Sequence, residues 1–148
     1  MNRSQRLTPV VDMNKRNEQQ AARLLSDSQQ SLAEREHKLQ ELVRYREDYA
    51  ARFASMGSNG AMASQLQDYR AFLANMNTAI AHQMRFVEAA RQEFQDKRGA
   101  WTQLHEKASA LENVIGRYRS EERHKSDLKE QAECDARPLR MLIPLETD

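Results

Sequence analysis

A repeat of apolar residues at alternating spacings of three and four limits what this chain can fold into. With its first core position at Leu66, the repeat continues to Tyr118 for about eight heptads, and only Gln83 and Lys97 interrupt it. A strict seven-residue repeat lags the natural twist of an α-helix, so it predicts a long helix in a left-handed coiled coil. The core positions of this repeat are Leu66, Tyr69, Leu73, Met76, Ile80, Gln83, Val87, Ala90, Phe94, Lys97, Trp101, Leu104, Ala108, Leu111, Ile115 and Tyr118.

Glycine and proline are too scarce for a fold with many turns. The chain of 148 residues has four glycines and three prolines, and no proline lies between Val10 and Arg137. A β-sandwich or an α/β enzyme of this size needs many turns, which these two residues usually form. The one strong turn signal is residues 56–60, Met-Gly-Ser-Asn-Gly. The chain is therefore predicted to be all-α, with one turn.

The turn divides the chain into two helices of unequal length. We expect a helix over about 8–55, a turn at 56–61, a second helix over about 61–136 and a flexible tail at 137–148, all forming one domain. Proline is tolerated in the first turn of a helix, which suits Pro9, whereas Pro138 is expected to end the second helix. Two apolar helices joined by a short turn should form an antiparallel coiled-coil hairpin.

The first helix has a less regular apolar stripe. Its two sets of core positions are Leu25, Leu32, Leu39, Arg46 and Phe53, and Ser28, Arg35, Leu42, Tyr49 and Met56. With the turn centred between residues 58 and 59, residue i should lie opposite residue 117 − i, which places Tyr45 opposite Phe72. The start of the first helix, near Thr8, would then lie opposite Ser109. About 25 residues of the second helix, including Ile115, would need another protein to cover their apolar face.

An apolar patch near the middle of the hairpin is wider than a two-stranded seam requires. The pairing rule places side by side two rows with spacings of four, three and four. Broader packing between the helices explains this pattern, and so does a docking surface rich in Tyr, Phe and Met. The rows are Lys38, Leu42, Tyr45 and Tyr49 on the first helix, and Phe72, Met76, Ala79 and Gln83 on the second.

The residues that carry catalysis or bind metals and cofactors form no recognisable motif. The four histidines belong to no metal-binding or catalytic spacing, no glycine-rich phosphate loop is present, and the one cysteine is Cys134. We therefore expect no enzymatic activity, no cofactor and no metal. The formal net charge of +1 does not suit a nucleic-acid binder. No signal peptide or membrane span is recognised, which indicates a cytoplasmic protein that reaches a membrane only through a partner.

Basic residues gather near the start of the chain and again near the end of the second helix, and the predicted hairpin brings these two segments toward its open end. They form a solvated face between acidic residues, or they steer the protein onto an acidic partner. The two groups are Arg3, Arg6, Lys15, Arg16 and Arg23, and Arg117, Arg119, Arg123, Lys125 and Lys129.

Several segments together resemble the FliJ family of bacterial flagellar export proteins over roughly residues 5 to 137. The matching features are residues 21–25 (AARLL), Tyr45 and Tyr49, the turn, residues 69–72 (YRAF), Ala79-Ile80 and Trp101. The resemblance implies an antiparallel hairpin, similar to the central stalk of rotary ATPases, that acts in flagellum assembly, motility and chemotaxis. It also implies three partners: the hexameric export ATPase, the cytoplasmic domain of the export gate, and export chaperones.

The family's gate-binding patch matches this chain at five positions, Leu42, Tyr45, Tyr49, Phe72 and Ala79. The resemblance implies partner binding through Leu42, Tyr45, Tyr49, Phe72, Met76, Ala79 and Gln83. The chain departs from the best-known members at Lys38, Met76 and Gln83. Two alternatives are the equivalent stalk of a virulence-type III secretion system and a generic dimerising coiled-coil scaffold. The hairpin interpretation predicts a monomer in isolation, peripheral to the inner face of the cell membrane through the export apparatus.

Overall fold

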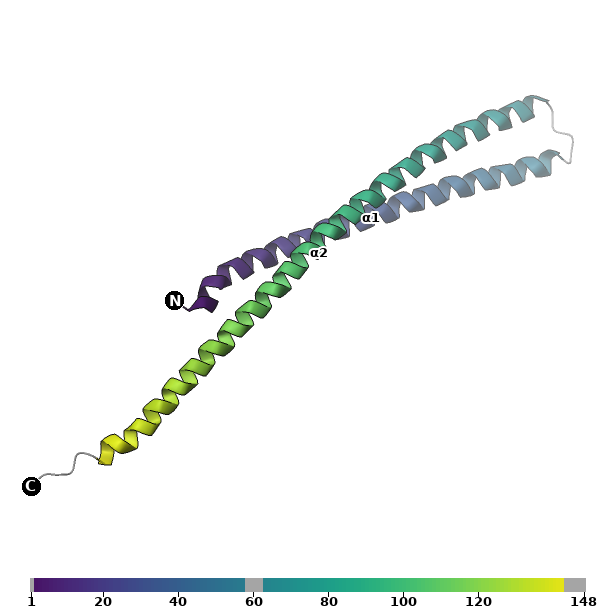
Figure 1. The fold of residues 1–148 in the computed structure, drawn as a ribbon. Helices are drawn as coiled ribbons and strands as arrows, with labels where there is room; N and C mark the ends of the chain where they lie inside the picture. Colours follow the sequence, from purple (N-terminus) through teal and green to yellow (C-terminus); the bar gives the residue numbers. More distant parts are fainter. Residues whose placement is uncertain (1, 58–62, 143–148) are drawn as a thin grey trace, which may run out of the picture. The chain divides into compact units, whose positions relative to one another are not determined.

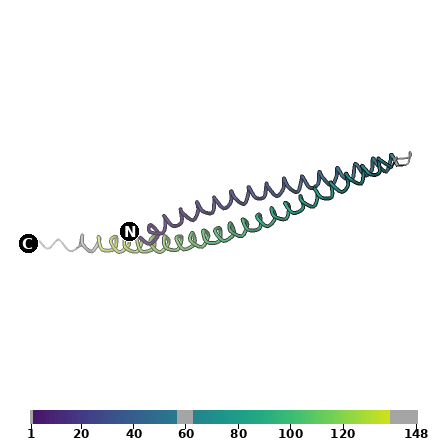
Figure 2. The backbone as a smooth tube through the Cα atoms, turned by 90° about the horizontal axis from the view of Figure 1, so that it is seen from above, coloured from purple at the N-terminus to yellow at the C-terminus, as the bar shows by residue number. Residues whose placement is uncertain are grey.

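Two long α-helices make up the described part of the protein. The computed structural model describes residues 2–57 and 63–142, with side chains through Arg137. Helix α1 spans Arg3–Gly57 and helix α2 spans Ala63–Leu142, and these described residues contain no strand. The helices run in opposite directions (Figure 1 and Figure 2). The prediction of an all-α hairpin with a longer second helix is confirmed.

Contacts between the helices divide the chain into two compact units. The central unit comprises residues 20–102 and contains the end of α1 and the start of α2. The terminal unit comprises residues 1–19 and 103–148 and contains the start of α1 and the later part of α2. Each unit has its own interhelical seam, and the two seams differ in their chemistry.

The heptad frame of α2 matches the burial of its side chains. Within the central unit, Met76, Ile80 and Val87 are buried, as are the frame positions Gln83 and Ala90. In the terminal unit the frame positions Ala108 and Ile115 are buried. Every frame position from Tyr69 to Tyr118 is buried or half-buried, whereas most positions between them are exposed. The apolar repeat therefore forms the seam that packs on α1, as a coiled coil requires.

Helix α1 begins five residues earlier than the sequence suggested. It starts at Arg3, so Pro9 lies inside the helix rather than in its first turn. Ser4 and Asn14 are buried beside Val11, although two of these three side chains are polar. These positions continue the core frame of α1 toward the N-terminus in steps of seven. Contacts with α2 therefore extend the helix beyond the point where local sequence preferences would end it.

Contacts between the helices follow the sequence-based rule near the turn and depart from it toward the open end. Tyr45 contacts Phe72, as the rule predicts, whereas Lys15 pairs with Glu112 and not with a residue near Thr102. Side chains also lean toward the N-terminus of their own helix, which separates contacting residues further. Ser4 contacts Glu122, whereas the rule places it opposite Asn113. The face at Leu111, Ile115 and Tyr118 is covered by α1, and the expectation that it needs another protein was wrong.

The structure describes only part of the predicted turn and part of the predicted tail. Residues 58–62, which contain most of the predicted turn, and residues 143–148 of the predicted tail lie outside the described residues. Helix α2 continues past Pro138 to Leu142. Proline removes one hydrogen bond from a helix, but the Arg, Leu and Met residues around it favour helix strongly. Neither described helix contains a segment whose length and hydropathy would suit a membrane span.

Candidate partner-binding surface

Five aromatic rings form a ladder across the central unit, alternating between the two helices. Phe53 stacks on Tyr69 with ring centroids 4.0 Å apart, and Tyr69 stacks on Tyr49 at 5.9 Å. Tyr49 lies against Phe72 at 3.8 Å, and Phe72 meets Tyr45 edge to face at 5.6 Å. The chain has one Trp, four Tyr and four Phe, so this ladder uses five of its nine aromatic residues.

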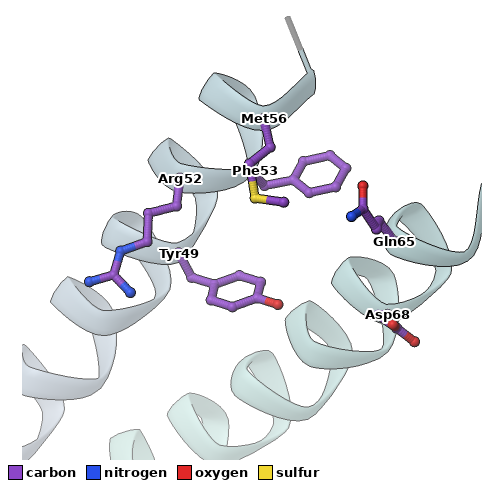
Figure 3. A pocket seen from close by; sticks show the side chains of 6 residues that line it. All are labelled: Tyr49, Arg52, Phe53, Met56, Gln65 and Asp68. Carbon is purple, nitrogen blue, oxygen red and sulfur yellow. The ribbon is translucent and has the colours of Figure 1, made fainter. Parts of the chain in front are cut away.

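Helical spacing brings these rings together. On α1 the three rings recur every four residues, and on α2 Tyr69 and Phe72 are three apart, so each set lies on one helix face. The rings of Tyr49 and Phe53 point toward α2, whereas Arg52 points away from it (Figure 3). Stacked and edge-to-face pairs each contribute about 0.5–1.5 kcal/mol beyond the burial of their area. The ladder therefore ties the helices together near the turn.

A hollow of about 190 Å³ lies beside the ladder on the side of the turn. Tyr49, Phe53 and Met56 contribute apolar surface to it, and Gln65 and Asp68 contribute polar groups from α2 (Figure 3). The hollow includes Tyr49 among the predicted partner-binding residues, and it does not include more distant ones such as Gln83.

The structure separates the predicted partner-binding residues by their exposure. Met76 and Gln83 are buried in the seam, and the Gln83 amide nitrogen Nε2 donates a hydrogen bond of 3.0 Å to the Arg35 carbonyl oxygen. Tyr45 is 55% exposed although it contacts Phe72. The remaining predicted residues, Leu42, Tyr49, Phe72 and Ala79, are half-buried.

The pairing rule correctly brought Tyr45 to Phe72, and it placed Tyr49 within reach of the same ring. The pairing rule did not identify Phe53 and Tyr69 as members of the ladder. Both were already at core positions of the repeats, so aromatic type at consecutive core positions was the signal that would have found them. Lys38 is exposed.

A second exposed aromatic residue lies apart from the ladder. Phe86 is 52% exposed and is not a core position of the repeat. The Arg35 guanidinium carbon lies 5.3 Å from the centre of its ring, an arrangement typical of a cation–π interaction. Phe86 thus resembles Tyr45 in exposure but not in surroundings, since no other ring contacts it among the described aromatic pairs.

Charged side chains border the seam of the central unit. Arg46 Nη1 donates to Asn77 Oδ1 at 2.9 Å, although Arg46 occupies a core position of the α1 frame. Arg91 pairs with Glu88 of its own helix at 3.3 Å and with Glu36 of α1 at 3.8 Å. These groups are half exposed, so water screens them and they contribute little to stability.

Polar contacts join the two helices in the terminal unit. Both the backbone N–H and the hydroxyl of Ser4 donate to the Glu122 carboxylate, at 3.2 and 2.6 Å. The Ser4 hydroxyl, more than any other group, holds the pKa of Glu122 below its ordinary value of 4.5, while partial burial acts in the opposite direction. The Arg3 guanidinium lies 5.6 Å from the centre of the Tyr118 ring.

Contacts at the edge of the terminal unit involve Lys15, one of the predicted basic cluster residues, and His105. Lys15 pairs with Glu112 at 3.1 Å, and His105 Nδ1 lies 2.6 Å from a carboxylate oxygen of Glu18. In the described residues, no group of three or more His, Cys, Asp and Glu side chains could hold a metal ion. The free cysteine, Cys134, is exposed.

Comparison with known proteins identifies one family. The family model described as "Flagellar FliJ protein" matches residues 3–140, nearly the whole chain. No curated protein and no solved structure shows a significant match.

Proposed function

The chain belongs to the flagellar FliJ protein family, non-enzymatic stalk and adaptor proteins of the flagellar export apparatus, and we propose that it connects the export ATPase to the export gate. The observation that supports this most is the family match over residues 3–140. The proposed partners are the hexameric export ATPase, the cytoplasmic domain of the export gate membrane protein, and export chaperones. Flagellum assembly, motility and chemotaxis depend on these contacts in this proposal.

The proposed gate-binding surface centres on Tyr45. Its side chain is the most exposed of the predicted partner-binding residues, and the ladder beneath it fixes its position against Phe72. A tyrosine held rigidly with half of its surface free is a typical interface anchor. Half-buried Leu42, Tyr49, Phe72 and Ala79 lie in the same central unit, and buried Met76 and Gln83 act by supporting the surface.

Substituting Tyr45 tests this surface. We expect Tyr45→Ala to weaken binding to the purified gate domain by about tenfold or more, with helicity unchanged by circular dichroism. Phe86→Ala is the matched control, because Phe86 is equally exposed but lies outside the ladder. Equal affinities for the two variants would contradict the proposal. Phe72→Ala is a poorer test, because Phe72 packs between two rings and its loss would mix binding with stability.

The terminal unit is the proposed contact with the export ATPase. The described end of α2 after Glu122 has only exposed residues from Arg123 to Asp135, with several basic groups among them. A chain truncated after Gln103 keeps the described central unit, and we expect it to lose stimulation of the ATPase. Full stimulation by the truncated chain, with helicity per residue preserved, would refute this contact.

The assembly state and the set of partners can be tested together. We propose that the protein is a monomer in isolation, located in the cytoplasm at the inner face of the cell membrane through the export apparatus. Light scattering at micromolar concentration should give the mass of one chain of 17.2 kDa. A pull-down from the native cell should recover the export ATPase and the gate protein; a stable dimer that recovers neither would favour a generic scaffold.

A further inference from the structure

The first six residues of α1 form a short helical segment that depends on α2. Residues 3–8 precede Pro9, which lies inside the helix. Proline has no N–H, so the Gln5 carbonyl loses its intrahelical partner, and the ring crowds the preceding turn. The segment is therefore joined to the rest of α1 by a weakened turn.

Polar contacts with α2 hold this segment in place. The Glu122 carboxylate accepts two hydrogen bonds from Ser4, one from the backbone N–H and one from the hydroxyl. The backbone bond satisfies one of the N–H groups that a helix start leaves without a partner. Arg3 adds a cation–π contact with Tyr118. The bonds to Glu122, a residue 118 positions away, add to the local bond that the Asn2 N–H donates to Gln5 Oε1 at the helix start.

Residues 3–8 lie at the end of the part of α2 that α1 covers. Ser4 and Ile115 are buried and Tyr118 is half-buried, whereas all residues from Arg123 to Asp135 are exposed. Asn2 and Arg3 lie beside Tyr118, Glu122 and Lys125 around a surface hollow. Displacement of residues 3–8 would uncover the face of α2 that includes Tyr118 without requiring any change in the α2 backbone.

We propose that residues 3–8 form a latch, which closes on α2 through Ser4–Glu122 and Arg3–Tyr118 and opens at Pro9. Opening exposes the apolar face of α2 near Ile115 and Tyr118, and closing covers it. The latch is a conformational device of the chain itself, and it does not depend on which partners bind elsewhere. The Glu122 carboxylate stabilises the closed state, so a single substitution of Glu122 shifts the latch toward the open state.

Hydrogen exchange of the full chain measures the latch directly. Glu122→Ala removes both acceptors, and we expect amides in residues 3–8 to exchange about tenfold faster, the usual effect of losing a hydrogen bond to a charged group. Glu130→Ala is the matched control, because Glu130 is an exposed glutamate of α2 beyond the contact with Ser4. Pro9→Ala should act in the opposite direction and slow exchange in the same segment by a few-fold, because it restores a helical N–H.

Thiol labelling follows the uncovered face of α2. In a Cys134→Ser background, a cysteine replacing Ile115 should react several-fold faster when Glu122→Ala is added, since opening raises the population of the accessible state. A cysteine replacing Ile80 is the control in the central unit, because Ile80 is equally buried. Its rate should not change with Glu122→Ala.

Three results would overturn the proposal. Unchanged exchange of residues 3–8 in Glu122→Ala would show that the contact does not hold the segment. An equal increase at the positions of Ile115 and Ile80 would show general destabilisation instead of local opening. Faster exchange in Pro9→Ala would show that the proline does not weaken the turn.

Discussion

The central and terminal units use the same two helices but different chemistry in their seams. In the central unit, rings and large aliphatic side chains fill the space between the helices, including Met76, Ile80 and Val87. In the terminal unit the buried residues include polar Ser4 and Asn14 beside Val11, Ala108 and Ile115, and Ser4 donates two hydrogen bonds to Glu122 across the helices. Burying apolar area contributes about 25 cal/mol per Å², whereas exposed polar pairs contribute little.

This difference predicts unequal local stability along one continuous pair of helices. The central unit should carry most of the unfolding free energy, and the terminal unit should open first. Partner-binding segments commonly come from such low-stability regions, because opening or reshaping them costs less. The comparison can be tested with matched changes in the two units.

The largest expected effect is at the buried isoleucines. Ile80 is 7% exposed and Ile115 is 6% exposed, so Ile→Ala removes the same atoms at similar depth. We expect Ile80→Ala to lower the unfolding free energy by about 2–4 kcal/mol, measured by urea titration of the helical circular dichroism signal. Ile115→Ala should lower it less and mainly increase hydrogen exchange within residues 103–137. Equal losses would mean that the two units unfold as one.

Gly99→Ala and Gly116→Ala should stabilise the protein by about 0.5–1 kcal/mol each. Both glycines lie inside α2, where glycine is less favourable than alanine. An added Cβ meets no atom within 4 Å at either position, so no packing reason opposes alanine. Thermal melts check the sign. A lower midpoint in Gly116→Ala alone would mean that the terminal unit needs a bend there.

Acid should loosen the terminal unit before the central one. The pKa of Glu122 is lowered in the folded protein, chiefly by the Ser4 hydroxyl, with Arg119 and Lys125 acting in the same direction. A lowered folded pKa means that the Ser4 contact contributes fully above 4.5 and is lost as pH falls through the lower value.

Protection factors of residues 3–8, corrected for intrinsic exchange rates, should therefore decrease below pH 4.5 while those near Ile80 persist. In Glu122→Gln, which cannot ionise, the acid-dependent part of this decrease should disappear. Persistence of the same decrease in that variant would assign it to other carboxylates.

The smallest expected effect is at the exposed ion pair of the terminal unit. Lys15 and Glu112 are each half exposed, so Lys15→Ala should change the unfolding free energy by at most about 0.5 kcal/mol. A double-mutant cycle with Glu112→Ala measures the coupling. A coupling well above that size would show that polar contacts stabilise this unit more than their exposure indicates.

Much of the fold was predictable because the heptad repeat is long. The core frame of α2 from Tyr69 to Tyr118 agrees with the observed burial, and the Tyr45–Phe72 contact follows from counting outward from the turn. The start of α1 was missed. Its frame continues through Val11 to Ser4 in steps of seven, but Asn14 and Ser4 are polar, which hid the continuation.

The candidate surface was predictable only in part. Spacing identified two rows of residues that face each other, and it could not distinguish a buried side chain from an exposed one at the edge of the seam. Gln83 is buried because its amide reaches the Arg35 carbonyl, whereas Tyr45 stays half free because it meets Phe72 only edge to face. Such differences depend on rotamers and on the relative rotation of the helices.

The sequence by itself determined that this protein is two unequal antiparallel helices, because a seven-residue apolar repeat with one glycine-rich break permits little else. Only the tertiary structure decided where α1 begins and how far it covers α2. The physical reason is that residues 3–8, with Pro9 after them, are a poor helix start alone. Glu122 supplies the missing hydrogen-bond acceptor from α2, and no local pattern around Ser4 contains that information.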